Sequence, residues 1–347
     1  AYEIMPSLVG SEMCIRDRPW MVVDGNYVYV AWQEFGGSQS GIRFARSSDY
    51  GRTWTRLTVD PSTTGIIALN VDDQGTIYMA YIGGWWWYGV YFTKSTNHGV
   101  SWTSSQYLED VYYSSGVGDR APINSIAAHG NGILFLTWVD DRNGSWDILG
   151  MRSTNGGASW TGPYLVNDIT QGGQCKGWVT FDPYGGLHTF WYHTPSWPTT
   201  TSSLWQVRYQ YSSDYGASFS SSVRITDTVF LGHYYNGNTD FMGDYHTIVA
   251  DSHYVYAVWT DGRDGNMNLY FSRALLPQSC ICGDINNDGS VDLADITYLA
   301  NYLYGGGPNP LCDLDPTSDG DWDFNDLIYL ANYLFAGGPP PCNGVLR

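Results

Sequence analysis

One eight-residue pattern, Ser-x-Asp/Asn-x-Gly-x-Ser/Thr-Trp/Phe, occurs four times and constrains the fold of this chain more than any other feature. The copies begin at Ser47, Ser95, Ser153 and Ser212, so their starts are 48 (95−47), 58 (153−95) and 59 (212−153) residues apart. Asp, Asn and Ser side chains that bond to nearby backbone, with a glycine that accepts positive φ, are typical of tight turns. We expect the final aromatic to fold beneath each turn. Four copies at this spacing predict a repeated structural unit.

Five segments around these turns share one order of elements. Each has a strand in which β-branched and aromatic residues alternate with small or polar ones, a composition typical of half-buried strands. These second strands are predicted at residues 28–32, 77–81, 134–138, 187–191 and 255–259. The fifth segment reaches residue 273 without a copy of the turn. Arg46, Lys94, Arg152 and Arg273 recur at the ends of the third strands, which indicates a scaffold role.

The repeats resemble the Asp-box (BNR) repeat of sialidase-like β-propellers over roughly residues 19–275. This resemblance implies an all-β propeller of about six blades, of which five are visible. It also places the box at a structural turn between the third and fourth strands, remote from the catalytic face. The box therefore identifies a fold better than it identifies an activity.

A second repeat, with a period of 31 residues, occupies the C-terminal tail, where residues 296–304 match 327–335. Each copy follows a loop with carboxylates at positions 1, 5 and 12 and glycine at position 6, which predicts a Ca²⁺ site followed by a helix. The predicted ligands are Asp284, Asn286, Asp288, Ser290, Asp292 and Asp295 in the first loop, and Asp315, Thr317, Asp319, Asp321, Asp323 and Asp326 in the second.

The tail resembles a type I dockerin, which implies a small α-helical domain with two calcium loops and a cohesin-type partner bound through residues 282–342. Thr317 is a weaker ligand than the Asp or Asn expected there. Leu293-Ala294 and Phe324-Asn325 stand where the family has a Ser-Thr-like pair. Surface attachment and plain stabilisation are alternative roles for this domain.

Charge and cysteine content indicate the setting. The net charge is −18, and residues 280–347 supply half of it through ten Asp and one Arg, which argues against nucleic acid or an anionic membrane as partner. No apolar run approaches the ~20 residues of a membrane span. Four of the six cysteines lie in the tail and predict disulfides in an extracellular or cell-surface protein. We expect a clasp from Cys342 to Cys280 or Cys282.

The expected domains follow from these features. Residues 1–18 resemble a translated sequencing adapter and are predicted to lie outside the fold. The propeller is expected at 19–275, a linker at 276–281 and the dockerin-like domain at 282–347.

By resemblance, a retaining sialidase needs three arginines, a Tyr nucleophile activated by Glu, and an Asp acid/base. Beyond residue 18 the chain has two Glu, both predicted among loop-like residues. The Asp–Arg pairs at 140/142 and 261/263 have two interpretations, a brace for the adjoining loop or a substrate-binding guanidinium. The catalytic candidates are Glu34, Glu109, Asp119, Asp140, Asp244 and Asp261, with Arg43, Arg120, Arg208 and Arg224 for the arginines.

Aromatic residues in predicted loops favour a binding function, because flat exposed rings stack on sugar faces. The same rings have a second interpretation as plugs between blades. The candidates are Trp85, Trp86, Trp87, Tyr88, Trp197, Tyr234 and Tyr235. The favoured function is recognition of glycans or surface polymers by the propeller, with the tail as anchor. The alternatives are a glycoside hydrolase of the exo-sialidase-like class and a structural, protein-binding propeller.

Overall fold

The computed structural model describes residues 15–35, 40–62, 65–83, 88–112, 124–200, 202–235, 238–241, 246–276, 282–286, 288–308, 310, 316–317, 319 and 321–341. The chain divides into two compact units, Ala1–Ala274 and Leu275–Arg347.

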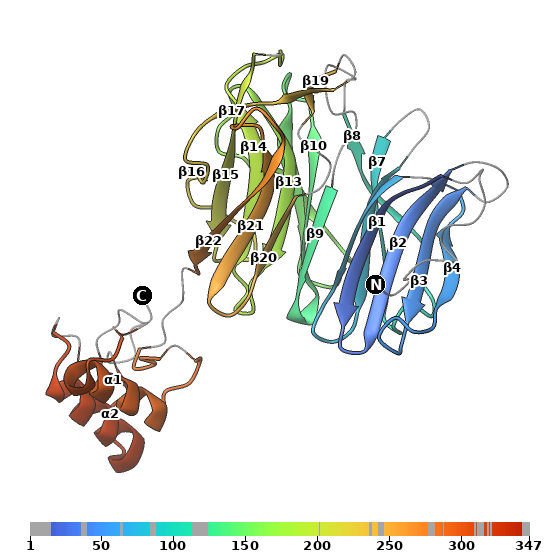
Figure 1. The fold of residues 1–347 in the computed structure, drawn as a ribbon. Coiled ribbons are helices and arrows are strands. Elements are labelled where there is room, and N and C mark those ends of the chain that lie inside the picture. Colours follow the sequence, from blue (N-terminus) through green and yellow to red (C-terminus); the bar gives the residue numbers. More distant parts are fainter. Residues whose placement is uncertain are drawn as a thin grey trace. The chain divides into compact units, whose positions relative to one another are not determined.

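The first unit is built from antiparallel sheets, here called blades one to five in chain order (Figure 1). Blade one is β1 (Ile15–Asp24), β2 (Tyr27–Phe35), β3 (Gly41–Ser47) and β4 (Thr55–Asp60). Blade two is β5 (Gly65–Val71), β6 (Ile77–Gly83), β7 (Tyr88–Ser95) and β8 (Gln106–Val111). Blade three is β9 (Asn124–His129), β10 (Ile133–Asp140), β11 (Asp147–Ser153) and β12 (Thr161–Leu165), with a short 3-10 turn at Gly130–Gly132.

Blades four and five depart from this four-strand plan. Blade four is β13 (Gly173–Phe181), β14 (Leu187–Thr194), β15 (Leu204–Ser212) and β16 (Val223–Arg224), with β17 (Phe230–Leu231) also paired to β15. A hairpin of β18 (His233–Tyr235) and β19 (Asn238–Phe241) leads to blade five, whose described strands are β20 (Thr247–Ala250), β21 (Tyr254–Asp261) and β22 (Asn268–Leu275).

The first strands of successive blades lie next to one another, in the order β1, β5, β9, β13 and β20. Trp20 of blade one also stacks on Trp178 of blade four, with ring centroids 4.9 Å apart. The predicted all-β propeller is confirmed. The five predicted second strands are β2, β6, β10, β14 and β21, each longer than its aromatic pattern.

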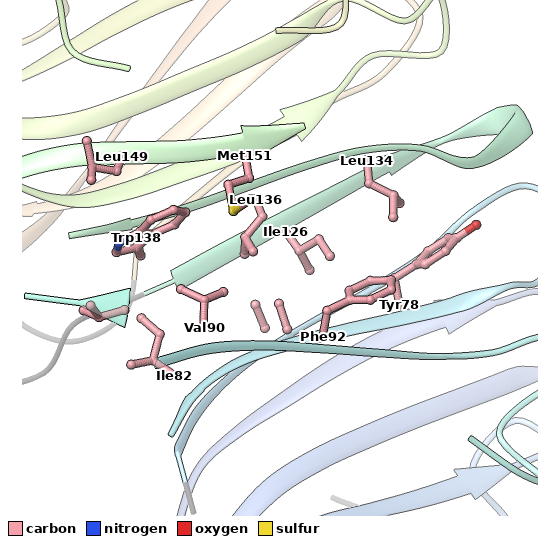
Figure 2. Packing of buried hydrophobic residues seen from close by; sticks show 13 residues of the cluster. Tyr78, Ile82, Val90, Phe92, Ile126, Leu134, Leu136, Trp138, Leu149 and Met151 are labelled. Atoms are coloured by element: carbon pink, nitrogen blue, oxygen red, sulfur yellow. The ribbon is translucent and has the colours of Figure 1, made fainter. Parts of the chain in front are cut away.

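Apolar side chains fill the space between neighbouring blades. Figure 2 shows the cluster between blades two and three. At one end Phe92 and Tyr78 face Ile126, and at the other end Val90 faces Trp138 of the next sheet. These side chains are almost entirely buried. Burial of this kind stabilises a blade by roughly 1.5–3 kcal/mol per large apolar side chain.

Each box has the same local hydrogen bonds. In blade one the Ser47 hydroxyl accepts from the Gly51 amide at 2.8 Å, and the Asp49 carboxylate accepts from the Thr53 amide at 2.8 Å. The glycine has positive φ in all four copies, as predicted. The sequence did not indicate that the preceding residue is also left-handed, with φ of 58° at Tyr50, 53° at His98, 65° at Gly156 and 59° at Tyr215.

The boxes of blades two and three dock onto the blade before them. The Arg46 guanidinium of blade one donates to the His98 carbonyl at 3.2 Å, and the Lys94 ammonium of blade two donates to the Gly156 carbonyl at 2.7 Å. The box aromatic meets a ring of the previous blade edge-on, as Trp160 meets Phe92 at 5.1 Å. The predicted scaffold role of Arg46 and Lys94 is therefore confirmed.

The described fold begins earlier than the expected boundary at residue 19. β1 starts at Ile15, and the backbone of residues 15–17 pairs with residues 33–35 before a register shift. An extended β2 offers unpaired backbone groups to any segment that lies along it, which accounts for this extension.

The second unit contains two helices, α1 (Leu293–Gly305) and α2 (Phe324–Ala336). They pack around Ile285, Leu299 and Leu330, which are fully buried. Each ends at a left-handed glycine, Gly306 or Gly337, as its Gly-Gly run predicts. None of the helices in the described part of the chain is long and apolar enough to cross a membrane.

Candidate functional sites

The connections of each blade fall at two opposite ends. The boxes join third to fourth strands, so the loops that join second to third strands lie at the other end, here called the loop end. Glu34, Asp140 and Asp261 all lie at the loop-end termini of second strands. The fold thus collects these candidates at one end of their blades.

Glu34 lies on β2 and not in a loop, so that expectation was wrong. Strand pairing continues to residue 35, beyond the aromatic that ends the alternating pattern. The Glu34 carboxylate is buried and pairs with the Arg43 guanidinium at 2.8 Å. The ion pair thus occupies the Glu34 carboxylate with an arginine, whereas activation of a tyrosine needs a hydrogen bond from the tyrosine hydroxyl to that carboxylate.

Glu109 lies on β8, which also corrects its expected place in a loop. It contacts Arg142 at 3.0 Å, and Arg142 binds the buried Asp140 through its Nε at 2.8 Å. The Asp140 hydrogen bond and charge raise the Arg142 pKa further above its usual range. Asp140 also accepts from the Trp138 indole and from the Arg142 amide. The pair braces the loop, as one of its two interpretations predicted.

Blade five repeats this arrangement. The buried Asp261 accepts from the Arg263 amide at 2.8 Å and from its Nε at 2.9 Å. The guanidinium also contacts Asp227 and lies over the Tyr270 ring, 4.1 Å from its centroid. Because the same contacts recur two blades apart, we assign both Asp–Arg pairs to the scaffold.

The remaining charged candidates do not form a described cluster. Arg208 donates to the Ser222 hydroxyl and carbonyl, and the exposed Arg224 donates to the Asp227 carbonyl. These arginines and Arg43 are bound to separate partners on different strands. The other three candidates, Asp119, Arg120 and Asp244, lie outside the described residues.

The predicted aromatic platform is described in part. Tyr88, at the start of β7, is 46% exposed. Trp197 is half-buried with its ring edge-on to Trp146 at 4.9 Å, which fits the plug interpretation. Tyr234 and Tyr235 belong to the strand β18, where a loop was expected. Trp85, Trp86 and Trp87 lie outside the described residues.

Two buried histidines lie at blade four: His193 is on β14, and His246, which precedes β20 of blade five, contacts β13. His193 Nδ1 lies 3.0 Å from the Gln174 amide nitrogen, and His246 Nε2 donates to the Lys176 carbonyl at 2.8 Å. Burial, helped by the Arg208 charge, lowers the pKa of His193 to about 4. Burial, helped by the Lys176 charge, lowers that of His246 to about 3. Both imidazoles are therefore neutral at pH 7. These histidines have no metal-ligand spacing in the sequence, which favours a hydrogen-bonded structural role, and both are hydrogen-bonded here.

The first acidic loop of the tail is folded around its own carboxylates. Asp284 accepts from the amides of Asp288 at 3.0 Å and Gly289 at 2.8 Å. Asp295 accepts from the amides of Asn286 at 3.1 Å and Asp292 at 2.8 Å. Asp284 and Asp295 are fully buried, and burial followed by neighbouring carboxylates raises the pKa of each.

The second loop repeats these contacts where it is described. The buried Asp326 accepts from the Thr317 amide and hydroxyl and, at 2.9 Å, from the Asp323 amide. Asp315, the first predicted ligand, lies outside the described residues. In both loops the position-9 and position-12 residues also form the capping box of the following helix.

The chemistry of this unit fits a cation. Residues 280–346 contain no Lys, Arg or His, so no side chain of this segment balances the buried carboxylates. Oxygen-only loops of this length suit Ca²⁺. Among the residues described, no group of three or more acidic, Cys or His side chains is gathered into a finished metal centre. Calcium binding therefore remains a proposal.

Comparison with known families and structures agrees with this division. Residues 282–335 match the dockerin type I domain, and the second unit contains that domain. No curated protein matches the sequence.

Solved structures match the propeller at low identity. A protein of unknown function from Dyadobacter fermentans is 15% identical, with a TM-score of 0.53, over 79% of this chain and 86% of that one. An ulvan lyase of polysaccharide lyase family PL25 is 14% identical, with a TM-score of 0.52, over 74% of this chain and 66% of that one. The chain thus spans just under two thirds of the lyase. At these identities the likeness shows the fold alone.

Proposed function

We propose that this is a secreted or cell-surface modular protein whose propeller recognises glycans or surface polymers and whose dockerin domain anchors it to a cohesin-type partner. The observation that carries the proposal is the pairing of two different units in one chain, a propeller and residues 282–335 with their dockerin match. A protein that joins an anchoring domain to a second folded unit can hold that unit at a surface, which is the arrangement proposed here.

The anchor is proposed to present the first turns of its two helices. Leu293 and Phe324 are exposed there, each directly after the capping aspartate of its helix. Ala294 and Thr297 line a hollow beside Leu293. Exposed apolar side chains at a rigid helix start supply contact area at low entropic cost, which suits a protein partner.

We propose that two Ca²⁺ ions order this domain, one for each loop. The support is the set of fully buried carboxylates Asp284, Asp295 and Asp326 in a segment without cationic side chains. A bound ion would supply the positive charge that these groups need when buried.

A disulfide clasp at the ends of the domain is proposed as well. Gly283 lies so close to Pro341 that a Cβ built on the glycine would be 2.8 Å from the proline ring. The cysteines at positions 282 and 342 adjoin these two residues. This contact favours Cys282 over Cys280 as the partner of Cys342.

The propeller is proposed to bind rather than to cleave its ligand. Both Glu candidates are held by arginines, and the Asp140 and Asp261 carboxylates brace their loops. Tyr88 adjoins the Trp85–Trp87 run and presents an exposed ring at the loop end of blade two. The PL25 neighbour is described as an ulvan lyase, so ulvan belongs in the ligand panel.

Two measurements on the purified chain test the proposal. We expect retention on a polysaccharide and glycan array that is lost in Trp86→Ala, with Tyr164→Ala, an exposed aromatic on β12, as the matched control. We also expect Ca²⁺-dependent binding to a cohesin panel that weakens in Leu293→Asp. Turnover of a sialoside or polysaccharide that disappears in Glu34→Gln or Glu109→Gln would contradict the binding function and assign an enzyme.

A further inference from the structure

Blade five has one apolar face that no other described blade covers. Side chains of β22 alternate, so Leu269, Phe271, Arg273 and Leu275 project to one side, and Phe271 is 60% exposed. We call these four residues the blade-five face. Large exposed apolar patches on folded proteins commonly mark interaction surfaces.

The equivalent residues of blades one and two show which groups pack on such a face. Leu269, Phe271 and Arg273 correspond to Ile42, Phe44 and Arg46 of blade one and to Val90, Phe92 and Lys94 of blade two. There the apolar residues are buried beneath the next blade. The basic residue binds the fourth-position carbonyl of the next box, and the phenylalanine meets the box aromatic.

The basic group of the blade-five face is already positioned for this role. The Arg273 guanidinium lies over the Tyr254 ring, 4.8 Å from its centroid, and Phe271 stacks with Tyr256. The face therefore combines an apolar stripe, an aromatic ring and a cationic donor in the arrangement that receives a box in blades one and two.

Blade one carries the complementary surface. Its box residue Tyr50 is 73% exposed, whereas the equivalent His98 is docked against the preceding blade through its ring and carbonyl. Met21 is also exposed, and alternation along β1 turns it away from the cluster that holds Trp20 and Val22 between blades one and two. We call Met21, Val23, Tyr50 and Trp54 the blade-one face.

These two faces do not cover each other within one copy. No strand of blade one packs along a strand of blade five among the residues described. At the centre Trp20 of β1 stacks instead on Trp178 of blade four.

We propose that the blade-five face of one copy binds the blade-one face of a second copy, head to tail. Arg273 then donates to the Tyr50 carbonyl, and Phe271 meets Trp54 as Phe92 meets Trp160. The faces differ, so each copy has one donor face and one acceptor face, and the contact is heterologous. A net charge of −18 opposes association at low ionic strength, so added salt strengthens it.

Sedimentation velocity of the full chain with Ca²⁺, over roughly 1–100 μM and at two salt concentrations, tests the contact. We expect the weight-average mass to reach at least twice that of one chain. Phe271→Asp and Met21→Asp each remove one face and should sediment as single copies. A 1:1 mixture of the two should form dimers and nothing larger, because one intact face of each kind is restored.

Tyr304→Asp, which changes an exposed aromatic on α1, is the control and should associate as the unaltered chain does. Circular dichroism establishes that each variant is folded. A monomeric unaltered chain throughout the range overturns the proposal. So does association of folded Phe271→Asp alone or of Met21→Asp alone, since the latter would mean that two like faces pair.

Discussion

At the scale of single residues, local hydrogen bonds determine one part of the box conformation and contacts with distant residues determine another. The Ser and Asp side chains satisfy nearby amides, which the sequence predicts because every partner lies within four residues. The left-handed fourth residue was not predicted, because residues other than glycine seldom adopt that conformation. His98 is held there by its stack on Tyr27 and its contact with Tyr29.

Tyr50 has the left-handed conformation but is 73% exposed, and within the described part of the chain its ring has no such stack, so Tyr50→Gly should stabilise the fold. A left-handed residue with a Cβ costs roughly 1–2 kcal/mol, and the greater freedom of unfolded glycine offsets part of that gain. We expect an increase of about 0.5–1 kcal/mol in the free energy of unfolding, measured by denaturant titration.

Tyr215→Gly is the matched control. It has the same φ but contacts the rings of His129 and Phe181, so its loss should destabilise the protein. Equal destabilisation by both substitutions would contradict this account.

Acid should destabilise blades four and five through the buried His193 and His246. The folded-state pKa values of His193 and His246, about 4 and about 3, lie below the unfolded value near 6.5. The unfolded chain therefore binds more protons below pH 6.5, and the stabilisation present above that pH is lost as pH falls toward 4. For His193 the loss reaches at most about 3 kcal/mol.

The measurement is the free energy of unfolding from pH 7 to pH 4 for the unaltered chain and for His193→Gln. The difference between the two should shrink on acidification. A difference that does not change with pH would show that His193 does not titrate on unfolding in this range.

At the scale of strands and blades, the sequence predicted which segments pair but not where they stop. The five second strands were found because alternation is a local signal, yet Glu34 and Glu109 were placed in loops. Their strands continue because a neighbouring strand supplies hydrogen-bond partners, and this depends on residues distant in the sequence. The docking of boxes onto preceding blades is likewise a long-range contact, so the recurrence of Arg46 and Lys94 indicated a scaffold without identifying its partner.

Lys94→Met should weaken the contact between blades two and three. It removes the charged donor to the Gly156 carbonyl and leaves that acceptor without its ammonium partner, at a cost of about 1–3 kcal/mol. Denaturant unfolding measures the loss. Arg224→Met, at an exposed site, should change stability by less than about 0.5 kcal/mol. If both variants have the same free energy of unfolding, the hydrogen bond from Lys94 to the Gly156 carbonyl does not contribute to stability.

At the scale of the whole molecule, the two units should respond differently to calcium. The buried carboxylates of the second unit lie in a segment, residues 280–346, that contains no basic side chain. In the propeller the buried Asp140 and Asp261 are paired with arginines, and its blades are held by apolar packing. In calorimetry EDTA should lower the melting transition of residues 282–341 and leave the propeller transition in place. Asp295→Asn should weaken the calcium response of the first loop. An identical profile with and without EDTA would refute the calcium assignment.

The boxes of blades two and three pack on the blade before them, and this contact implies an order in which the blades can assemble during synthesis. A blade can pack on the preceding blade as soon as that blade has folded. This contact does not depend on any residue that is synthesised later. Synthesis from the N-terminus therefore delivers acceptor surfaces before the boxes that occupy them, so the structure can grow by addition at one moving end. A nascent chain paused between two blades would be a shorter series of blades with one exposed apolar face at its end. The next blade would pack on that face when translation continues.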